Sequence, residues 1–205
     1  MNLRVPYFFF LNRWIVTGIT AGSLKWRTLR MSAYVVVLNG GSSSGKTTIG
    51  RCLQELLPDP WLLLGVDDLL AAMPQGQDDS IITFAPDGGI FVGPGFRRLE
   101  AAWYHGIAAM ARSGVGVIVD EVFLGGGDAQ ARLRAALSGL DVLWVGVHCD
   151  PGVAAAREAA RPDRVPGMAA AQAEAVHQGV NYDVEVDTTS LSALDCAQRI
   201  KARVV

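Results

Sequence analysis

Short, largely β-branched apolar segments alternate with helical patterns from residue 34 to the end of the chain. The expected strands cover residues 34–39, 61–66, 115–120, 141–148 and 182–188. Alternation of this kind is typical of βαβ units, whose strands pair in parallel. The second, third and fourth segments are almost continuously apolar, as strands are when helices cover both faces of their sheet. We therefore predict an α/β fold, a three-layer sandwich with a five-stranded parallel sheet and helices on both faces.

Helical periodicity occupies most of the intervening sequence. Apolar residues from Ile49 to Leu57 repeat at helical spacing and stop at Pro58, and a second stripe runs from Leu99 to Met110. Further helices are expected over residues 128–137, 150–160, 168–177 and 192–204. The stretch from Met73 to Phe96 is rich in Gly, Pro and Asp, and we expect it to be irregular and functional or mobile.

The first thirty residues differ from the rest in charge. They carry five basic side chains and no acid, whereas the whole chain has a net charge of −2, so the remainder is clearly acidic. Their apolar run is broken by Asn12 and Arg13 and is shorter than the ~20 residues that a membrane helix needs. We predict that residues 1–30 are an extension outside the fold, that residues 31–205 form one domain, and that the protein has no membrane partner.

The charge, cysteines and histidines of the chain indicate which classes of function are disfavoured. An acidic body argues against a nucleic-acid surface. The three cysteines are scattered, without disulfide or zinc spacing, which favours a cytoplasmic location. The histidines His105, His148 and His177 do not have the spacing of a metal or catalytic set, and we interpret them as structural.

Residues 40–47, GGSSSGKT, match the pattern GxxxxGK[ST] between an expected strand and an expected helix. Glycines allow the backbone N–H groups to surround an anion, and the helix start adds a partial positive charge. We expect the phosphates, and not packing, to give this loop its shape. Lys46 would contact the β and γ phosphates, and Thr47 would ligate Mg²⁺. The expected nucleotide-binding residues are Gly40, Gly41, Ser42, Ser43, Ser44, Gly45, Lys46, Thr47 and Thr48.

Acidic residues stand at the ends of two other expected strands. Asp120 closes residues 115–120, where a carboxylate can hold the Mg²⁺ shell beside the loop. Asp67 and Asp68 follow residues 61–66, at the edge where α/β sheets bind ligands. One of the pair could accept a proton from an attacking hydroxyl and the other could cap the next helix. We expect Asp67 to be the base.

Three arginines, Arg157, Arg161 and Arg164, lie in and after the helix expected at residues 150–160. Basic side chains on a closing lid can neutralise charge on a transferring phosphoryl group. The alternative for each is an ordinary solvated surface position.

The segments "LNGGSS", "PWL", "GVD", "AMP", "VFLGG", "DVLWVGV" and "YDVEVDTT" carry a resemblance to the chloramphenicol phosphotransferase family of P-loop kinases. The resemblance begins near residue 34 and implies a P-loop kinase domain over residues 31–205 with a small lid. It implies ATP and Mg²⁺ as cofactors and phosphorylation of the primary hydroxyl of chloramphenicol, with Asp67 as base. The family pattern has a second aspartate after Asp120, where this chain has Glu121.

Two alternatives stay open beside this expectation. A sister kinase would use the same mechanism on another hydroxyl compound, and only the acceptor pocket would differ. A P-loop ATPase would use Glu121 to orient water, but Asp67 would then have no assigned role. A purely nucleotide-binding module is disfavoured by the complete set of Lys46, Thr47 and placed acids.

Overall fold

The computed structural model describes residues 34–74, 81–84, 90–160 and 167–204. The predicted extension at residues 1–30 lies outside the described residues, as do Arg161 and Arg164 of the expected lid. No helix among the described residues has both the length and the apolar character that a membrane crossing requires.

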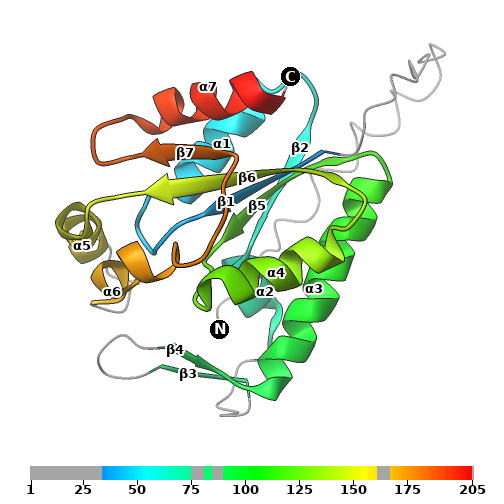
Figure 1. The fold of residues 1–205 in the computed structure, drawn as a ribbon, viewed down its shortest axis with the longest axis horizontal. Helices are drawn as coiled ribbons and strands as arrows, with labels where there is room; N and C mark the ends of the chain where they lie inside the picture. Colours follow the sequence, from blue (N-terminus) through cyan, green and yellow to red (C-terminus); the bar gives the residue numbers. More distant parts are fainter. Residues whose placement is uncertain (1–33, 75–80, 85–89, 161–166, 205) are drawn as a thin grey trace, which may run out of the picture. The chain divides into compact units, whose positions relative to one another are not determined.

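A five-stranded parallel sheet forms the centre of the fold (Figure 1). Its strands are β1 (Tyr34–Asn39), β2 (Trp61–Gly65), β5 (Gly116–Glu121), β6 (Asp141–His148) and β7 (Val184–Asp187). They lie in the order β2-β5-β1-β6-β7. The predicted sheet is therefore confirmed, with each strand end within two residues of its expected position. The crossover connections place β1 between β5 and β6, where its carboxyl end meets theirs.

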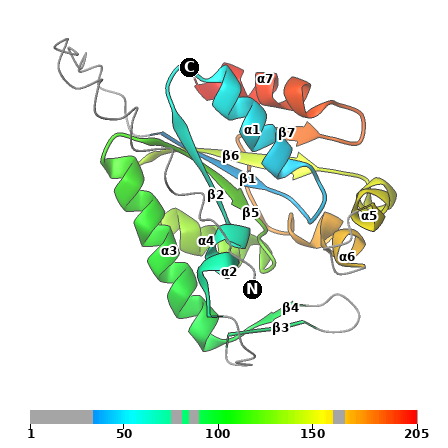
Figure 2. The same ribbon diagram turned by 180° about the vertical axis from the view of Figure 1, so that it is seen from behind.

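Helices cover both faces of this sheet. Helices α1 (Lys46–Leu56) and α7 (Ala193–Val204) cover one face, and α3 (Pro94–Arg112) and α4 (Gly126–Ala136) cover the other (Figures 1 and 2). Side chains of β1 alternate between the two cores, because Val36 and Leu38 join the α1 side while Val35 and Val37 join the α3 side. The predicted three-layer arrangement is confirmed.

Three shorter helices stand near the carboxyl edge of the sheet. They are α2 (Val66–Ala72), α5 (Pro151–Ala159) and α6 (Met168–Ala175). Helix α2 follows β2 without a loop, so the expected strand at residues 61–66 ends one residue early. Helix α5 begins at a capping aspartate, since the Asp150 carboxylate accepts hydrogen bonds from the backbone N–H groups of Gly152 and Val153.

The stretch from Met73 to Phe96 was expected to be irregular, and this expectation is wrong in part. Strand β3 (Ile82–Phe84) pairs antiparallel with β4 (Ile90–Val92), and α3 begins as early as Pro94. Proline fits the first turn of a helix, where its missing N–H would have no partner. Each strand has only three residues, too few for an alternating pattern to stand out from the surrounding glycines and prolines.

Candidate active site

The loop between β1 and α1 is built for an anion. Gly45 and Ser43 have positive φ angles of 93° and 59°, which turn backbone N–H groups inward. A Cβ atom at Gly40 would come within 2.4 Å of the Val147 carbonyl oxygen, so glycine is required there. The hydroxyl oxygens of Ser42, Ser43 and Ser44 are buried without a partner among the described residues. Such orphaned donors fit phosphate oxygens.

The expectation that the loop does not pack is wrong. Gly40, Gly41, Ser42 and Ser44 are buried, and protein groups hold the loop from three sides. The Ser42 N–H donates to Gln172 Oε1 at 2.9 Å, Lys46 Nζ donates to the Gly41 carbonyl at 2.9 Å, and Thr188 Oγ1 donates to the Ser44 carbonyl at 2.8 Å. Contacts within the protein therefore contribute to the shape of the loop.

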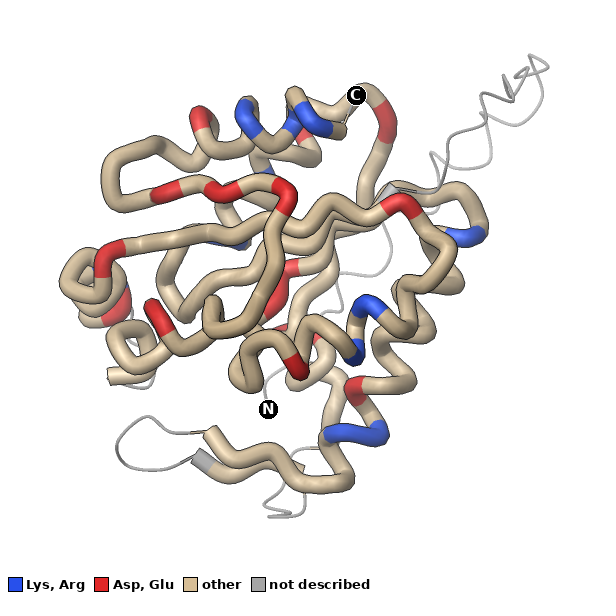
Figure 3. Tube along the Cα trace, in the orientation of Figure 1, with Lys and Arg blue, Asp and Glu red and all other residues tan. Residues whose placement is uncertain are grey.

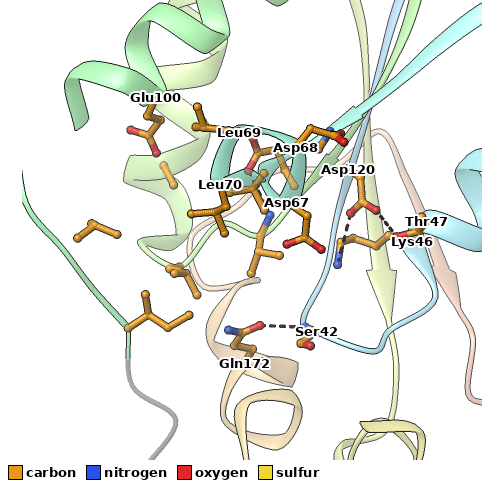
Figure 4. Close-up of a pocket in the computed structure, with 18 of the residues that line it drawn as sticks. Ser42, Lys46, Thr47, Asp67, Asp68, Leu69, Leu70, Glu100, Asp120 and Gln172 are labelled. Atoms are coloured by element: carbon orange, nitrogen blue, oxygen red, sulfur yellow. Dashed lines mark hydrogen bonds and ion pairs between the residues drawn. The ribbon is translucent and has the colours of Figure 1, made fainter. Parts of the chain in front are cut away.

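Lys46, Thr47 and Asp120 come together at the start of α1 (Figure 4). Thr47 Oγ1 donates to Asp120 Oδ2 at 2.6 Å, and Lys46 Nζ lies 3.7 Å from Asp120 Oδ1. The contact follows from the sheet, because β1 and β5 are neighbours and Leu38 pairs with Asp120. The structure therefore brings together the lysine and the two expected Mg²⁺ ligands, which sequence alone could place only on separate elements.

A third group of contacts surrounds Asn39, the last residue of β1. Asn39 Nδ2 donates to the Val176 carbonyl at 2.9 Å and to the Tyr182 hydroxyl at 2.6 Å, and Asn39 Oδ1 accepts from the Phe123 N–H at 2.9 Å. Because the Tyr182 oxygen accepts from Asn39, its own proton is available to His177 Nδ1, 2.6 Å away. His177 in turn stacks on His148. This polar network fixes the chain just before the loop.

The two adjacent aspartates of α2 have different surroundings. Asp68 Oδ2 accepts a hydrogen bond from the Gly65 N–H at 2.7 Å, which caps the first turn of α2. Asp67 lines the cavity and points toward Lys46 and Asp120 in Figure 4. The division of the pair into one capping and one cavity-facing carboxylate matches the expected geometry. The role of Asp67 as base stays a prediction.

Arg157 is held by groups behind the loop. Its Nη2 donates to the Thr188 carbonyl at 2.8 Å, and its Nη1 donates to Thr188 Oγ1 at 3.1 Å and to Cys149 Sγ at 3.4 Å. Thr188 also contacts the loop, so Arg157 supports the loop indirectly. The expected contact of Arg157 with a transferring phosphoryl group stays a prediction.

One cavity of about 430 Å³ joins the phosphate loop to the space beneath the β3–β4 pair. Its walls away from the loop are largely apolar. The apolar lining residues include Leu69, Leu70, Ile82, Ile90, Val92, Phe96 and Leu124. A pocket of this size and character suits a small, mainly apolar molecule beside the phosphates.

Two further carboxyl groups line this cavity, and sequence analysis missed the part that Glu100 plays. Glu121 is 4% exposed, and burial raises its pKa to about 8. Glu100 is 7% exposed and accepts hydrogen bonds from Arg97 and Arg132. The sequence does contain a signal for Glu100, because this glutamate falls at a core-facing position of the amphipathic helix α3. A buried charge is usually paired with another charged group.

Thr47 and Asp120 are too few to hold a metal ion without help. No cluster of three or more His, Cys, Asp or Glu within the described ranges is arranged for that purpose. Mg²⁺ usually takes one or two protein ligands and completes its shell with substrate phosphates and water. The residues present therefore fit Mg²⁺ carried with a nucleotide.

The fold and the site together define a P-loop kinase, with a phosphate loop between the first strand and helix and an acidic residue on the adjacent strand. The chain belongs to the chloramphenicol phosphotransferase-like family, whose description matches residues 33–205. It is also 32% identical to a protein of Mycobacterium tuberculosis named as a proposed O-phosphotransferase, over 91% of this chain and 90% of that one.

Several solved structures share the fold at low sequence identity. A sugar kinase from Janibacter has a TM-score of 0.59 at 17% identity and covers 82% of this chain and 92% of its own. Shikimate kinase from Acinetobacter baumannii, in complex with shikimate, has a TM-score of 0.54 at 19% identity, with 83% and 92% covered. The tunicamycin resistance protein of Deinococcus radiodurans has a TM-score of 0.58 at 19% identity, with 83% and 94% covered.

Proposed function

We propose that this protein transfers a phosphoryl group from ATP to a hydroxyl of a small, mainly apolar alcohol of the chloramphenicol type. The observation that carries the proposal is a single cavity in which Lys46 and Asp120 stand beside Asp67, with apolar walls extending away from them. Membership in the chloramphenicol phosphotransferase-like family supports the same class of acceptor.

The residues of the chain have distinct roles in this proposal. The loop N–H groups and Lys46 bind and orient the phosphates, and Thr47 and Asp120 hold Mg²⁺, which supplies charge neutralisation for phosphoryl transfer. Asp67 accepts the proton of the acceptor hydroxyl as its oxygen attacks. The apolar wall excludes water from the reacting groups, which favours transfer to the alcohol over hydrolysis.

Glu121 is a poor candidate for a water-orienting base. Its carboxyl is buried and accepts a hydrogen bond from the Val122 N–H at 3.2 Å. Burial raises its pKa to about 8. Asp67, by contrast, lines the same cavity and has a role in the kinase reaction but none in ATP hydrolysis. This observation favours the kinase over the ATPase.

The direct test is incubation of the purified protein with Mg·ATP and chloramphenicol, followed by mass spectrometry of the antibiotic. We expect a product heavier by one phosphoryl group and little ATP loss in a control without acceptor. Phosphorylation of another alcohol from a panel, but not of chloramphenicol, would indicate a sister kinase. ATP loss that is equal with and without any acceptor would contradict the proposal and favour the ATPase.

A further inference from the structure

The cavity has a charged end on the opposite side of Asp67 from the phosphate loop. Glu100 of α3 accepts hydrogen bonds from Arg97 Nη1 at 2.9 and 3.1 Å and from Arg132 Nε and Nη2 at 3.1 and 3.5 Å. Arg132 Nη1 donates to the Asp128 carbonyl at 3.2 Å. Figure 4 shows Glu100 separated from Lys46 by Asp67 and Leu70. Figure 3 shows basic segments on α3 and α4 near an acidic segment of α3. Two helices thus contribute to one charged cluster.

The two arginines differ from Glu100 in exposure. The Glu100 side chain is 9% exposed, whereas the side chains of Arg97 and Arg132 are 38% and 37% exposed, and all three line the cavity. Toward Glu100, Arg97 uses Nη1 alone, so its Nε and Nη2 do not depend on that carboxylate. A buried carboxylate therefore fixes two guanidinium groups at the surface of the cavity.

The cluster has an excess of positive charge, because two guanidinium groups contact a single carboxylate. A guanidinium presents a planar fork of N–H donors that fits two oxygens held in one plane. Leu69 and Leu70 line the cavity between Glu100 and Asp67 (Figure 4). A ligand that reaches both ends must therefore have an apolar middle.

We propose that Arg97 binds the end of the acceptor remote from its reacting hydroxyl, with Arg132 adding positive charge beside it, and that this end carries a planar pair of oxygens, as in a nitro or carboxylate group. Glu100 is a positioning residue that orients the two arginines. This inference rests on the proposed function, because it assumes that the reacting hydroxyl lies at Asp67.

The test measures binding of acceptors without nucleotide, by calorimetry on the full chain. Chloramphenicol is compared with two analogues, one with hydrogen and one with carboxylate in place of its nitro group. We expect the nitro or the carboxylate compound to bind at least ~10-fold more tightly than the hydrogen analogue, since hydrogen bonds to charged groups are strong. Preference for the carboxylate alone would show that the oxygen pair must be anionic.

The variants Arg97→Gln and Arg132→Gln should each reduce this preference by several-fold and leave binding of the hydrogen analogue within ~2-fold of wild type. Glu100→Gln should reduce the preference as well, although it contacts no ligand. The control Arg98→Gln changes an exposed arginine of the same helix that does not line the cavity, and it should keep the preference. Arg97→Lys is a second variant in case Arg97→Gln folds poorly. It keeps the positive charge but lacks the planar pair of N–H donors, so it separates the contribution of charge from that of donor geometry.

Wild-type protein that binds neither oxygen-bearing compound more tightly than the hydrogen analogue would overturn the inference. A preference that survives in both arginine variants would do the same. The outcome is independent of the phosphorylation assay, since no ATP is present. Phosphorylated chloramphenicol without the preference would leave the proposed function standing, and the preference without phosphorylation would contradict only that function.

Discussion

At the scale of single residues, the site depends on neighbours that give similar side chains different roles. Asp67 and Asp68 are adjacent in sequence, yet one faces the cavity and the other accepts the Gly65 N–H at 2.7 Å. Asp120 and Glu121 are also adjacent, yet one contacts Thr47 and the other is buried with a raised pKa. The environment of each carboxyl group therefore determines its chemistry.

Replacing Asp67 by asparagine should remove the base while keeping a side chain of nearly the same shape. We expect Asp67→Asn to lower kcat for the acceptor by at least ~10²-fold and to leave nucleotide affinity nearly unchanged. The matched control is Asp68→Asn, which should cost about 1 kcal/mol of stability through the weakened cap, with a much smaller effect on kcat. Steady-state kinetics with nucleotide titration measures both effects. A larger loss of kcat in the Asp68 variant would assign the base to Asp68.

Replacing Lys46 by alanine should instead damage binding and transfer together. Lys46 is 6% exposed and lies beside Asp120 at the phosphate loop. Charge-assisted hydrogen bonds contribute ~1.5–3 kcal/mol, so nucleotide affinity should fall at least ~10-fold. Lys201→Ala in α7, which is remote from the cavity lining, should change neither quantity. Equal ATP affinity in wild type and Lys46→Ala, measured by calorimetry, would contradict the assignment of the loop.

At the scale of elements, the helices after β6 and the turn after β7 complete a loop that β1 and α1 begin. Gln172 of α6 accepts the Ser42 N–H, and a Cβ atom at Gly41 would come within 3.2 Å of the Ala173 backbone nitrogen. Thr188, after β7, reaches the Ser44 carbonyl. The second half of the chain therefore supports the phosphate loop by packing against it.

Gln172→Ala should loosen the loop without changing any residue of the phosphate loop itself. The buried Ser42 N–H loses its partner, which costs ~1–3 kcal/mol. We expect the thermal midpoint to fall by ~2–4 °C for each kcal/mol, and nucleotide affinity to fall with it. Glu174→Ala in the same helix is an exposed control that should show neither change. An unaltered midpoint in Gln172→Ala would show that the contact adds nothing to loop stability.

The elements with strong patterns could be predicted from sequence, and the contacts between elements could not. The five strands and the phosphate loop followed from apolar runs and from a motif with fixed spacing. The β3–β4 pair could not be predicted, because three-residue strands carry no periodic signal. The roles of Gln172 and Glu100 could not be predicted, because a single sequence does not show which distant residues meet. Gln172 contacts Ser42, 130 residues away, and Glu100 contacts Arg132, 32 residues away.

At the scale of the whole domain, the polar network at the end of β1 connects the loop to the outer strand of the sheet. It extends from Asn39 through Tyr182 and His177 to His148, whose Nε2 lies 2.7 Å from Glu185. The Tyr182 hydroxyl donates to His177 Nδ1, and such a bond requires the neutral imidazole. The state of protonation of one histidine therefore affects the stability of the fold.

Stability should decrease as the pH falls below neutrality, partly through His177. Burial, and next the neighbouring His148, lower the pKa of His177 from 6.5 to about 4. The unfolded chain therefore binds more protons than the folded protein between pH 6.5 and 4, and the stabilising contribution present above pH 6.5 is lost across that window. Denaturant unfolding at several pH values should give a flatter pH dependence for His177→Gln than for wild type. If the free energy of unfolding changed with pH in the same way in both proteins, a contribution of His177 would be excluded.

The contacts that hold the phosphate loop also bear on how fast it can be occupied. Hydrogen bonds to Gln172 and Thr188 restrict the loop backbone independently of any ligand, which reduces the conformational entropy that the loop can lose when a nucleotide binds. Association with a preorganised site needs no slow rearrangement of the loop. We therefore expect the observed rate of nucleotide binding to rise linearly with concentration, without the plateau that a rate-limiting change of shape would impose.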